Sequence, residues 1–237
     1  MTVSPPSPSP PAAAGSPVYV AGPMFSVADL QEQLNVATTL ENAGYTTYLP
    51  QRDGIEVAAV MADVNANLNL KPDEIADVFT FVRKIVFALD IYQLINRCGA
   101  VVFNMDGRVP DDGSVSETAS GFVAGKPIVI LKTTPITMLG GYDNPMVSGL
   151  TTTWTYVTQI ADLPSALAAR VAAVASLHGP AFQPGPQLAA VERLGAAIWG
   201  LMPTIRTDAT LPPGKLYAAV QDLERQVQPL LAAAFPV

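Results

Sequence analysis

Apolar and polar residues alternate along the chain in blocks that predict β-strands separated by α-helices. Short continuous apolar runs are typical of buried strands, and segments with apolar residues every three to four positions are typical of helices. The predicted strands are 17–21, 45–49, 100–103, 128–131 and 154–157. The predicted helices are 29–43, capped by Asp29, then 73–96, 114–124 and 164–177. Residues 51–69 are polar and poorly periodic, so no element is expected there.

Strands that alternate with helices form a parallel sheet. The expected fold class is therefore α/β, a flavodoxin/Rossmann-like parallel five-stranded sheet with helices on both faces. Sites in such sheets lie at the carboxyl ends of the strands. We therefore expect the loops after Ala21, Leu49, Phe103 and Leu131 to surround the pocket.

Composition along the chain predicts three parts. Residues 1–16 are uncharged and rich in Pro, Ser and Ala, which indicates a disordered leader without the basic start of a secretory signal. Residues 17–178 form the expected α/β domain. Residues 179–237 are expected to be a C-terminal helical extension with two helices near 186–201 and 214–234, packed on the core or on a partner.

Charge and apolar content exclude some classes of partner. The chain is 49% apolar and 14% charged, with 13 Lys and Arg against 20 Asp and Glu, a net charge of −7. Because phosphate backbones attract basic surfaces, we expect no nucleic-acid partner. No run reaches the ~18 apolar residues of a membrane span, so no membrane partner is expected.

Single cysteine and histidine residues limit the chemistry further. Cys98 is the only cysteine and is expected to be a small buried or half-buried residue, consistent with a reducing, cytoplasmic location. His178 is the only histidine and precedes Gly179-Pro180 at an expected helix end. A Ser-His-Asp system and a His-rich metal site are therefore not expected.

Carboxylates gather where the third strand leads into the next helix. They are Asp106, Asp111, Asp112 and Glu117. This grouping suits chemistry in which a carboxylate stabilises or attacks the anomeric carbon of a sugar. Glu117 is expected on the first turn of its helix, with no Lys or Arg at helical spacing. The alternative is a capping box, in which Glu117 bonds back to the backbone of Ser114.

Two further polar residues stand in apolar surroundings. The hydroxyl of Tyr19 needs a partner because its strand is otherwise apolar, and a backbone group of the core is one alternative. Asp90 lies in an apolar stretch of helix, where a carboxylate is costly unless paired or functional; the alternative is a solvent-facing position near Arg83 or Arg97. Gly22, followed by proline, would let the backbone approach a ligand.

Taken together, these segments resemble nucleoside 2-deoxyribosyltransferases over roughly residues 17–160. The matching positions are Tyr19-Val20-Ala21-Gly22-Pro23-Met24-Phe25, Asp90, Asp111, Gly113, Glu117, Gly125-Lys126-Pro127 and Asn144-Pro145-Met146. The chain departs from the family where Thr118-Ala119 follow Glu117, and residues 51–72 and the tail beyond 180 lack counterparts.

The resemblance implies a reaction and a set of roles. Glu117 would attack the anomeric carbon of a deoxynucleoside, with Tyr19 holding Glu117 by a hydrogen bond and Asp90 protonating the leaving base. Asp111 and a neighbouring subunit's Asn144 would hold sugar hydroxyls, and Met146 would line the base side. Gly22, Phe25 and Gly113 are the other expected substrate contacts; Gln51-Arg52-Asp53 is a further candidate for reaching the base. The resemblance implies nucleosides and free nucleobases as ligands, a homo-oligomer with shared sites, and no metal or organic cofactor.

Two other functions remain open at this point. A nucleoside or nucleotide N-glycosidase of the same superfamily would use water in place of the second base. Ser114 and Ser116 at a helix N-terminus suit a phosphate, but Asp111 and Asp112 would repel it, which favours a nucleoside. A catalytically silent nucleoside-binding protein would keep the fold and lose the pairing of Tyr19 with Glu117.

Overall fold

The computed structural model describes residues 15–67, 69–107, 109–135, 137, 140–177, 180–205 and 214–236. The predicted leader therefore lies outside the described residues except for Gly15 and Ser16, and so does His178. The chain forms two compact units. Unit 1 comprises Met1–Tyr48 and Cys98–Pro180, and unit 2 comprises Leu49–Arg97 and Ala181–Val237. Residues 49–97 thus group with the C-terminal helices, whereas the sequence analysis assigned them to the sheet domain.

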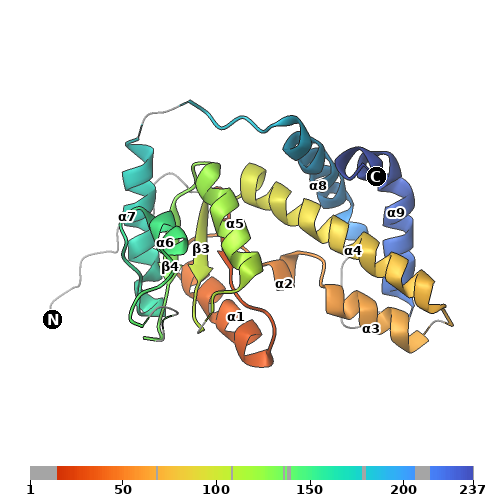
Figure 1. The fold of residues 1–237 in the computed structure, drawn as a ribbon, viewed down its shortest axis with the longest axis horizontal. Coiled ribbons are helices and arrows are strands. Elements are labelled where there is room, and N and C mark those ends of the chain that lie inside the picture. Colours follow the sequence, from red (N-terminus) through yellow and green to blue (C-terminus); the bar gives the residue numbers. More distant parts are fainter. Residues whose placement is uncertain are drawn as a thin grey trace. The chain divides into compact units, whose positions relative to one another are not determined.

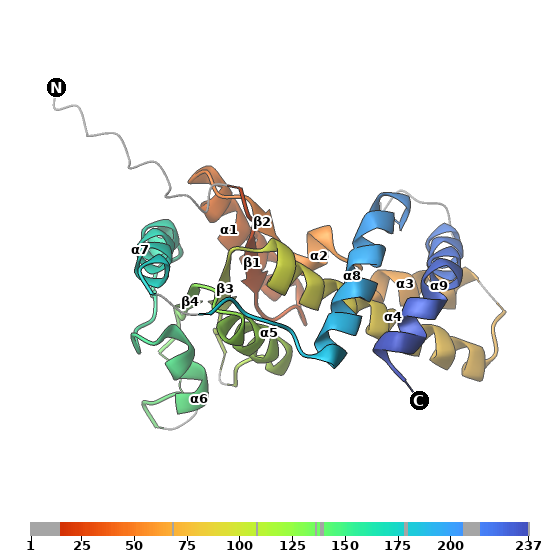
Figure 2. The same ribbon diagram turned by 90° about the horizontal axis from the view of Figure 1, so that it is seen from above.

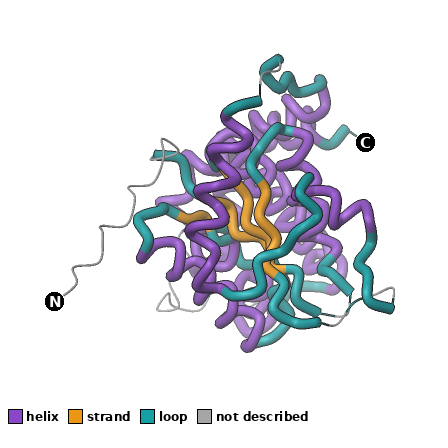
Figure 3. The backbone as a smooth tube through the Cα atoms, turned by 90° about the vertical axis from the view of Figure 1, so that its left-hand side faces the viewer, coloured by secondary structure: helices purple, strands orange, loops and turns teal. Residues whose placement is uncertain are grey.

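Unit 1 is built on a parallel sheet of four strands in the order β2-β1-β3-β4 (Figure 3). The strands are β1 (Val18–Ala21), β2 (Thr47–Tyr48), β3 (Ala100–Asn104) and β4 (Ile128–Leu131). Val18 is in register with Ala100, and Val102 with Val129. Every residue of β1, β3 and β4 is buried, as expected for a parallel sheet covered on both faces.

Helices cover both faces of this sheet. The covering helices are α1 (Val27–Asn42), α5 (Asp112–Val123) and α7 (Leu163–Ala175). Unit 1 also contains the short helix α6 (Pro145–Ser148) and 3-10 turns at Gly149–Thr151 and Ile160–Asp162. The first helix lies on one side of the strands and α5 on the other (Figure 2). Helix α1 begins at the N-cap Ser26 rather than at Asp29. Asp29 is the other half of that capping box, since its carboxylate accepts the N–H of Ser26 at 2.8 Å.

The predicted fifth strand is wrong. Within residues 154–157, Val157 alone pairs with the sheet, through a single parallel bridge to Leu131. Thr152 and Trp154 both have φ of 58°, in the left-handed region, so the chain cannot run extended beside β4 at this point. The α/β class holds, with four parallel strands in place of five.

Unit 2 is helical. Its elements are α2 (Pro50–Asp53), α3 (Val57–Asn67), α4 (Pro72–Tyr92), a π-helical turn (Gln93–Arg97), α8 (Pro186–Ile205) and α9 (Lys215–Ala234) (Figure 1). The stretch 51–69, expected to lack regular structure, is thus mostly helical. Val60 and Val64 explain this, because they give α3 a buried face at i, i+4 spacing.

Close packing joins the helices of unit 2. A Cβ atom on Gly195 of α8 would lie 2.1 Å from the carbonyl oxygen of Ala88 on α4, so only glycine permits this approach. Asp63 of α3 accepts the backbone N–H groups of Gly214 at 2.6 Å and Tyr217 at 3.0 Å. Its carboxylate therefore caps the first turn of α9 from a neighbouring helix.

Of the helices that the structure describes, α8 is long and apolar enough to cross a membrane. Its buried residues include Val191, Leu194 and Ile198, which belong to the core cluster shared with α4 and α9. Core packing within unit 2 accounts for the apolar composition of this helix.

Candidate active site

The central contact of the candidate site joins the first strand to α5. The hydroxyl of Tyr19 donates a hydrogen bond of 2.7 Å to Oε1 of Glu117. Tyr19 is fully buried on β1, and its ring lies 5.5 Å from that of Tyr48, centroid to centroid. The hydrogen bond expected from the resemblance is confirmed, and it fixes a half-buried carboxylate against a rigid strand.

Glu117 is not a helix cap. The N-cap of α5 is Asp111, whose Oδ2 accepts the backbone N–H of Ser114 at 2.7 Å and the Ser114 hydroxyl at 2.5 Å. The helix therefore begins three residues earlier than a Ser114 cap would require. Glu117 falls on its second turn rather than the first. The capping-box alternative is wrong.

Asp111 and Gly113 together shape the start of α5. A Cβ atom on Gly113 would lie 3.3 Å from Oδ2 of Asp111, a tight contact that glycine avoids. In the described structure Oδ2 holds the cap, and no hydrogen bond is formed by Oδ1 of Asp111. This oxygen is therefore an unused acceptor at the start of α5.

Gly22 is required by packing at the end of β1. A Cβ atom there would lie 2.0 Å from Nε2 of Gln33, a buried residue of α1. Among the described residues, neither amide atom of Gln33 has a hydrogen-bond partner. The position thus serves the close approach of α1 to the sheet, and its contact with substrate stays a prediction. Phe25, three residues on, is 81% exposed.

The segment that contains Asn144 and Met146 forms the short helix α6. Oδ1 of Asn144 caps this helix by accepting the N–H of Met146 at 2.9 Å. The amide nitrogen of Asn144 forms no hydrogen bond in the described structure, and the Met146 residue is 80% exposed. The Asn144 amide nitrogen and the Met146 side chain are therefore available for contacts at a surface of unit 1.

A buried polar network lies beneath this segment, and the sequence analysis missed it. Lys132 follows β4 and forms an ion pair with Asp143 at 3.2 Å, while the hydroxyls of Ser148 and Tyr156 lie 2.6 Å apart. Burial raises the pKa of Tyr156, the Ser148 hydrogen bond lowers it, and the Asp143 carboxylate raises it again. The sequence does contain one indication of this network, a lysine directly after an apolar strand, because such a lysine needs a partner when it is buried.

The other carboxylates of the predicted cluster have structural or exposed positions. Asp106 accepts the N–H groups of Thr133 at 2.8 Å and Thr134 at 2.9 Å, so it ties the loop after β3 to the loop after β4. Asp112 is exposed. Burial, and then the charge of Asp106, raise the pKa of Glu32 on α1, a carboxylate that the sequence analysis did not select.

The Gly125-Lys126-Pro127 segment connects α5 to β4. Gly125 has φ of 75°, and Nζ of Lys126 donates to the carbonyl oxygen of Cys98 at 2.8 Å. Burial lowers the pKa of Lys126, and Cys98 opposes that shift. These contacts lie at the amino ends of β3 and β4, so the segment ends the helix and anchors the strands. Cys98 is buried, as expected.

Two predicted contacts belong to unit 2. Asp90 is half-buried on α4. In the segment 51–53, Arg52 pairs with Asp53 at 2.9 Å, and Asp53 also accepts the N–H of Leu49 at 2.9 Å. The roles assigned to these residues stay predictions. Within the described residues, no group of three or more His, Cys, Asp or Glu side chains is arranged to hold a metal ion.

Comparison with known proteins gives structural likenesses only. No family model and no curated protein matches the sequence. Among solved structures, a conserved protein from Enterococcus faecalis V583 matches at 22% identity over 66% of this chain and 99% of its own, with a TM-score of 0.43. A 2-deoxyribosyltransferase from Bacillus psychrosaccharolyticus matches at 18% identity over 63% and 90%, also with a TM-score of 0.43. At these scores neither match carries an argument about activity.

Proposed function

We propose that this chain is a nucleoside deoxyribosyltransferase, which moves 2-deoxyribose from one nucleobase to another in the cytoplasm. The observation that carries the proposal is the 2.7 Å hydrogen bond from Tyr19 to Glu117, within the motifs that resemble that family. A carboxylate that already sits in one orientation loses little freedom on meeting the sugar, which is the advantage of a positioned nucleophile.

The proposed reaction has two displacements. A carboxylate oxygen of Glu117 forms a bond to the anomeric carbon as the bond from that carbon to the base nitrogen breaks. The electron pair leaves with the base, which takes a proton from Asp90. A nitrogen of the second base then attacks the same carbon and gives its proton back to the Asp90 carboxylate, as the bond from that carbon to Glu117 breaks and the Glu117 carboxylate leaves. Two inversions give net retention.

The remaining residues hold the substrate in this proposal. Oδ1 of Asp111 accepts a sugar hydroxyl while Oδ2 keeps the helix cap. Asn144 and Met146 enter the pocket of a second copy of the chain, where the Asn144 amide binds the sugar and Met146 lines the base. Gly22, Phe25 and Gly113 contribute the other contacts. The substrates are nucleosides and free nucleobases.

Trapping the sugar on the enzyme tests the proposal. A deoxynucleoside with fluorine at the 2-position slows the second displacement, because it destabilises the oxocarbenium-like transition state. Mass spectrometry should then find one added sugar on the peptide that contains Glu117. The adduct should persist in Glu32→Gln, which removes another carboxylate of unit 1, and should be absent from Glu117→Ala.

The outcomes separate the candidate functions. A trapped adduct with exchange of a second base supports the transferase. Release of free sugar at the same rate with and without a second base would instead indicate an N-glycosidase. A protein that binds deoxynucleosides but forms no adduct and exchanges no base would be the silent binding protein. Label on Asp90 or Asp111 would contradict the role given to Glu117.

A further inference from the structure

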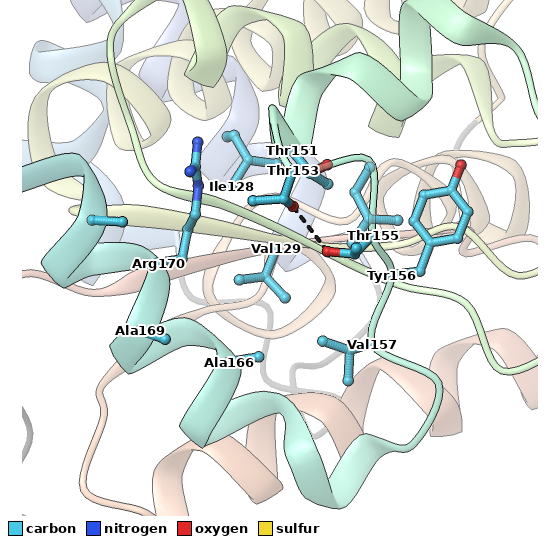
Figure 4. Close-up of a pocket in the computed structure, with 12 residues that line it drawn as sticks. Ile128, Val129, Thr151, Thr153, Thr155, Tyr156, Val157, Ala166, Ala169 and Arg170 are labelled. Carbon is cyan, nitrogen blue, oxygen red and sulfur yellow. Dashed lines mark hydrogen bonds between the residues drawn. The ribbon is translucent and has the colours of Figure 1, made fainter. Parts of the chain in front are cut away.

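A cavity of about 450 Å³ opens on unit 1 at the edge of β4. It lies between that strand, the segment 151–157 and helix α7 (Figure 4). This volume falls in the range typical of small-molecule sites. None of the residues proposed for the transfer reaction lines it. Its lining includes Val129, Thr153, Thr155, Ala169, Arg170 and Ala173.

Two features of the sequence keep this space open. The positive φ angles of Thr152 and Trp154 hold the chain away from β4 where a fifth strand would fill the gap. On α7, three of the four lining side chains are alanines, and two of them, Ala169 and Ala173, are spaced four apart on one face. Small side chains there leave room that leucine or valine would occupy.

The walls combine an apolar floor with one cation. Figure 4 shows Arg170 rising from α7 on one side, the threonines on the other and Val129 between them. The guanidinium donates one hydrogen bond, from Nη2 to the hydroxyl of Thr152 at 2.8 Å, and its buried Nε has no partner. In the part of the chain that the structure describes, no carboxylate pairs with Arg170. Arginine has five donors, so most of its capacity is unused.

We propose that this cavity binds a small organic monocarboxylate. The hydroxyls of Thr153 and Thr155 lie 2.9 Å apart and share one hydrogen bond, so one of the two keeps a proton to donate. The carboxylate of the ligand lies against the Arg170 guanidinium and accepts from that hydroxyl, and its apolar portion covers Val129 and the alanines of α7. The planar donor fork of arginine matches the two oxygens of a carboxylate. A single cation on a chain with net charge −7 favours a monoanion over a polyanion.

Hexanoate is the probe for this site, with hexan-1-ol as its neutral counterpart of equal chain length. The full chain, labelled with ¹⁵N, is titrated with each compound, and the amide signals of Thr153, Thr155 and Ala169 are followed. Hexanoate should shift them saturably. Hexan-1-ol should bind about tenfold more weakly or worse, because it forms no charge-assisted hydrogen bonds.

Variants test separately the contribution of the Arg170 charge and that of the cavity volume. Arg170→Met keeps the apolar stem and should weaken hexanoate about tenfold or more, while leaving hexan-1-ol unchanged. Arg225→Met removes an exposed arginine of unit 2 and should change neither affinity. Ala169→Leu should abolish binding by filling the cavity. Ala173→Leu fills the cavity one helical turn further along α7, and it replaces Ala169→Leu in the test if that variant disturbs the helix.

Two results would overturn the proposal. One is the absence of any saturable shift with hexanoate. The other is equal affinity for hexanoate and hexan-1-ol together with no effect of Arg170→Met, which would leave only an apolar hollow. Unchanged amide signals elsewhere in the spectrum establish that each variant is folded.

Discussion

Lys132 and Asp143 form an ion pair at 3.2 Å in unit 1, and each side chain is only 4% exposed. The pair links the first residue after β4 to the residue that precedes Asn144. The Lys132 ammonium forms no hydrogen bond of ordinary geometry among the described residues, so charge alone holds the contact. Removal of either partner would leave an uncompensated buried charge.

We therefore expect Asp143→Asn to lower the free energy of unfolding by about 3 kcal/mol, the cost typical of breaking a buried pair. Urea unfolding of the full chain measures this. The matched control is Asp222→Asn, which breaks the exposed pair with Arg225 at 2.9 Å and should cost no more than ~0.5 kcal/mol. Equal effects of the two variants would show that the buried pair contributes nothing particular to stability.

Tyr19→Phe should lower the rate of base exchange by about 10- to 100-fold, since it removes one hydrogen bond to the charged nucleophile. Glu117→Ala should abolish exchange. Tyr45→Phe is the control, because the Tyr45 hydroxyl bonds the carbonyl oxygen of Pro164 at 3.4 Å instead. If Tyr19→Phe exchanges bases at the wild-type rate, the hydrogen bond is structural only.

Glu32→Gln should stabilise the protein at neutral pH and not in acid. Burial and the charge of Asp106 raise the Glu32 pKa above its usual 4.5 in the folded chain. The protonated form therefore favours folding, and this contribution is present below the unfolded pKa and is lost as pH rises through the folded pKa. Glutamine cannot ionise, so the Glu32→Gln variant does not lose this stability as pH rises.

Thermal melts of wild type and Glu32→Gln from about pH 3 to pH 7 measure the difference, which should grow with pH. The gain should be small, since solvent partly screens the charge of a half-buried group. Asp77→Asn, an exposed change on α4, reports the general effect of removing one negative charge. A difference between wild type and Glu32→Gln that is independent of pH would contradict the assignment.

The proposed sharing of sites between copies predicts rescue on mixing. Asn144→Ala and Glu117→Ala should each be inactive, and a mixture of the two should regain part of the exchange activity, because a mixed dimer contains one intact site. Sedimentation at assay concentration should find a dimer or larger species. An active monomer, or a mixture as inactive as its parts, would place all the site residues within one copy.

The sequence predicted the parts of the fold in which local pattern and tertiary packing agree. Continuous apolar runs identified β1, β3 and β4, the periodic apolar positions of α4 identified that helix, and the composition of the tail indicated α8 and α9. The prediction of a fifth strand at residues 154–157 was wrong because an apolar pattern does not reveal the positive φ angles at Thr152 and Trp154. Helix α3 was missed because its buried face is short and its pattern weak.

The candidate site shows a similar division. Tyr19 was selected because a buried hydroxyl needs a partner, and the structure supplies Glu117. The position of the α5 cap could not be decided from sequence, since Asp111 and Ser114 are both good cap residues. The pairing of Lys132 with Asp143 depends on where the chain returns after β4, which no local pattern specifies.

The division of the chain between the two units bears on the order of events during synthesis. The central strand β1 needs β3, yet residues 49–97, which belong to unit 2, are made between them. A nascent chain that has emerged as far as Pro180 would hold every strand of the sheet. The buried faces of α3 and α4, with Val64, Ile85 and Leu89, would still await α8 and α9. For that interval the nascent chain would contain a complete sheet and, in unit 2, an exposed apolar helical surface, the kind of intermediate that chaperones bind.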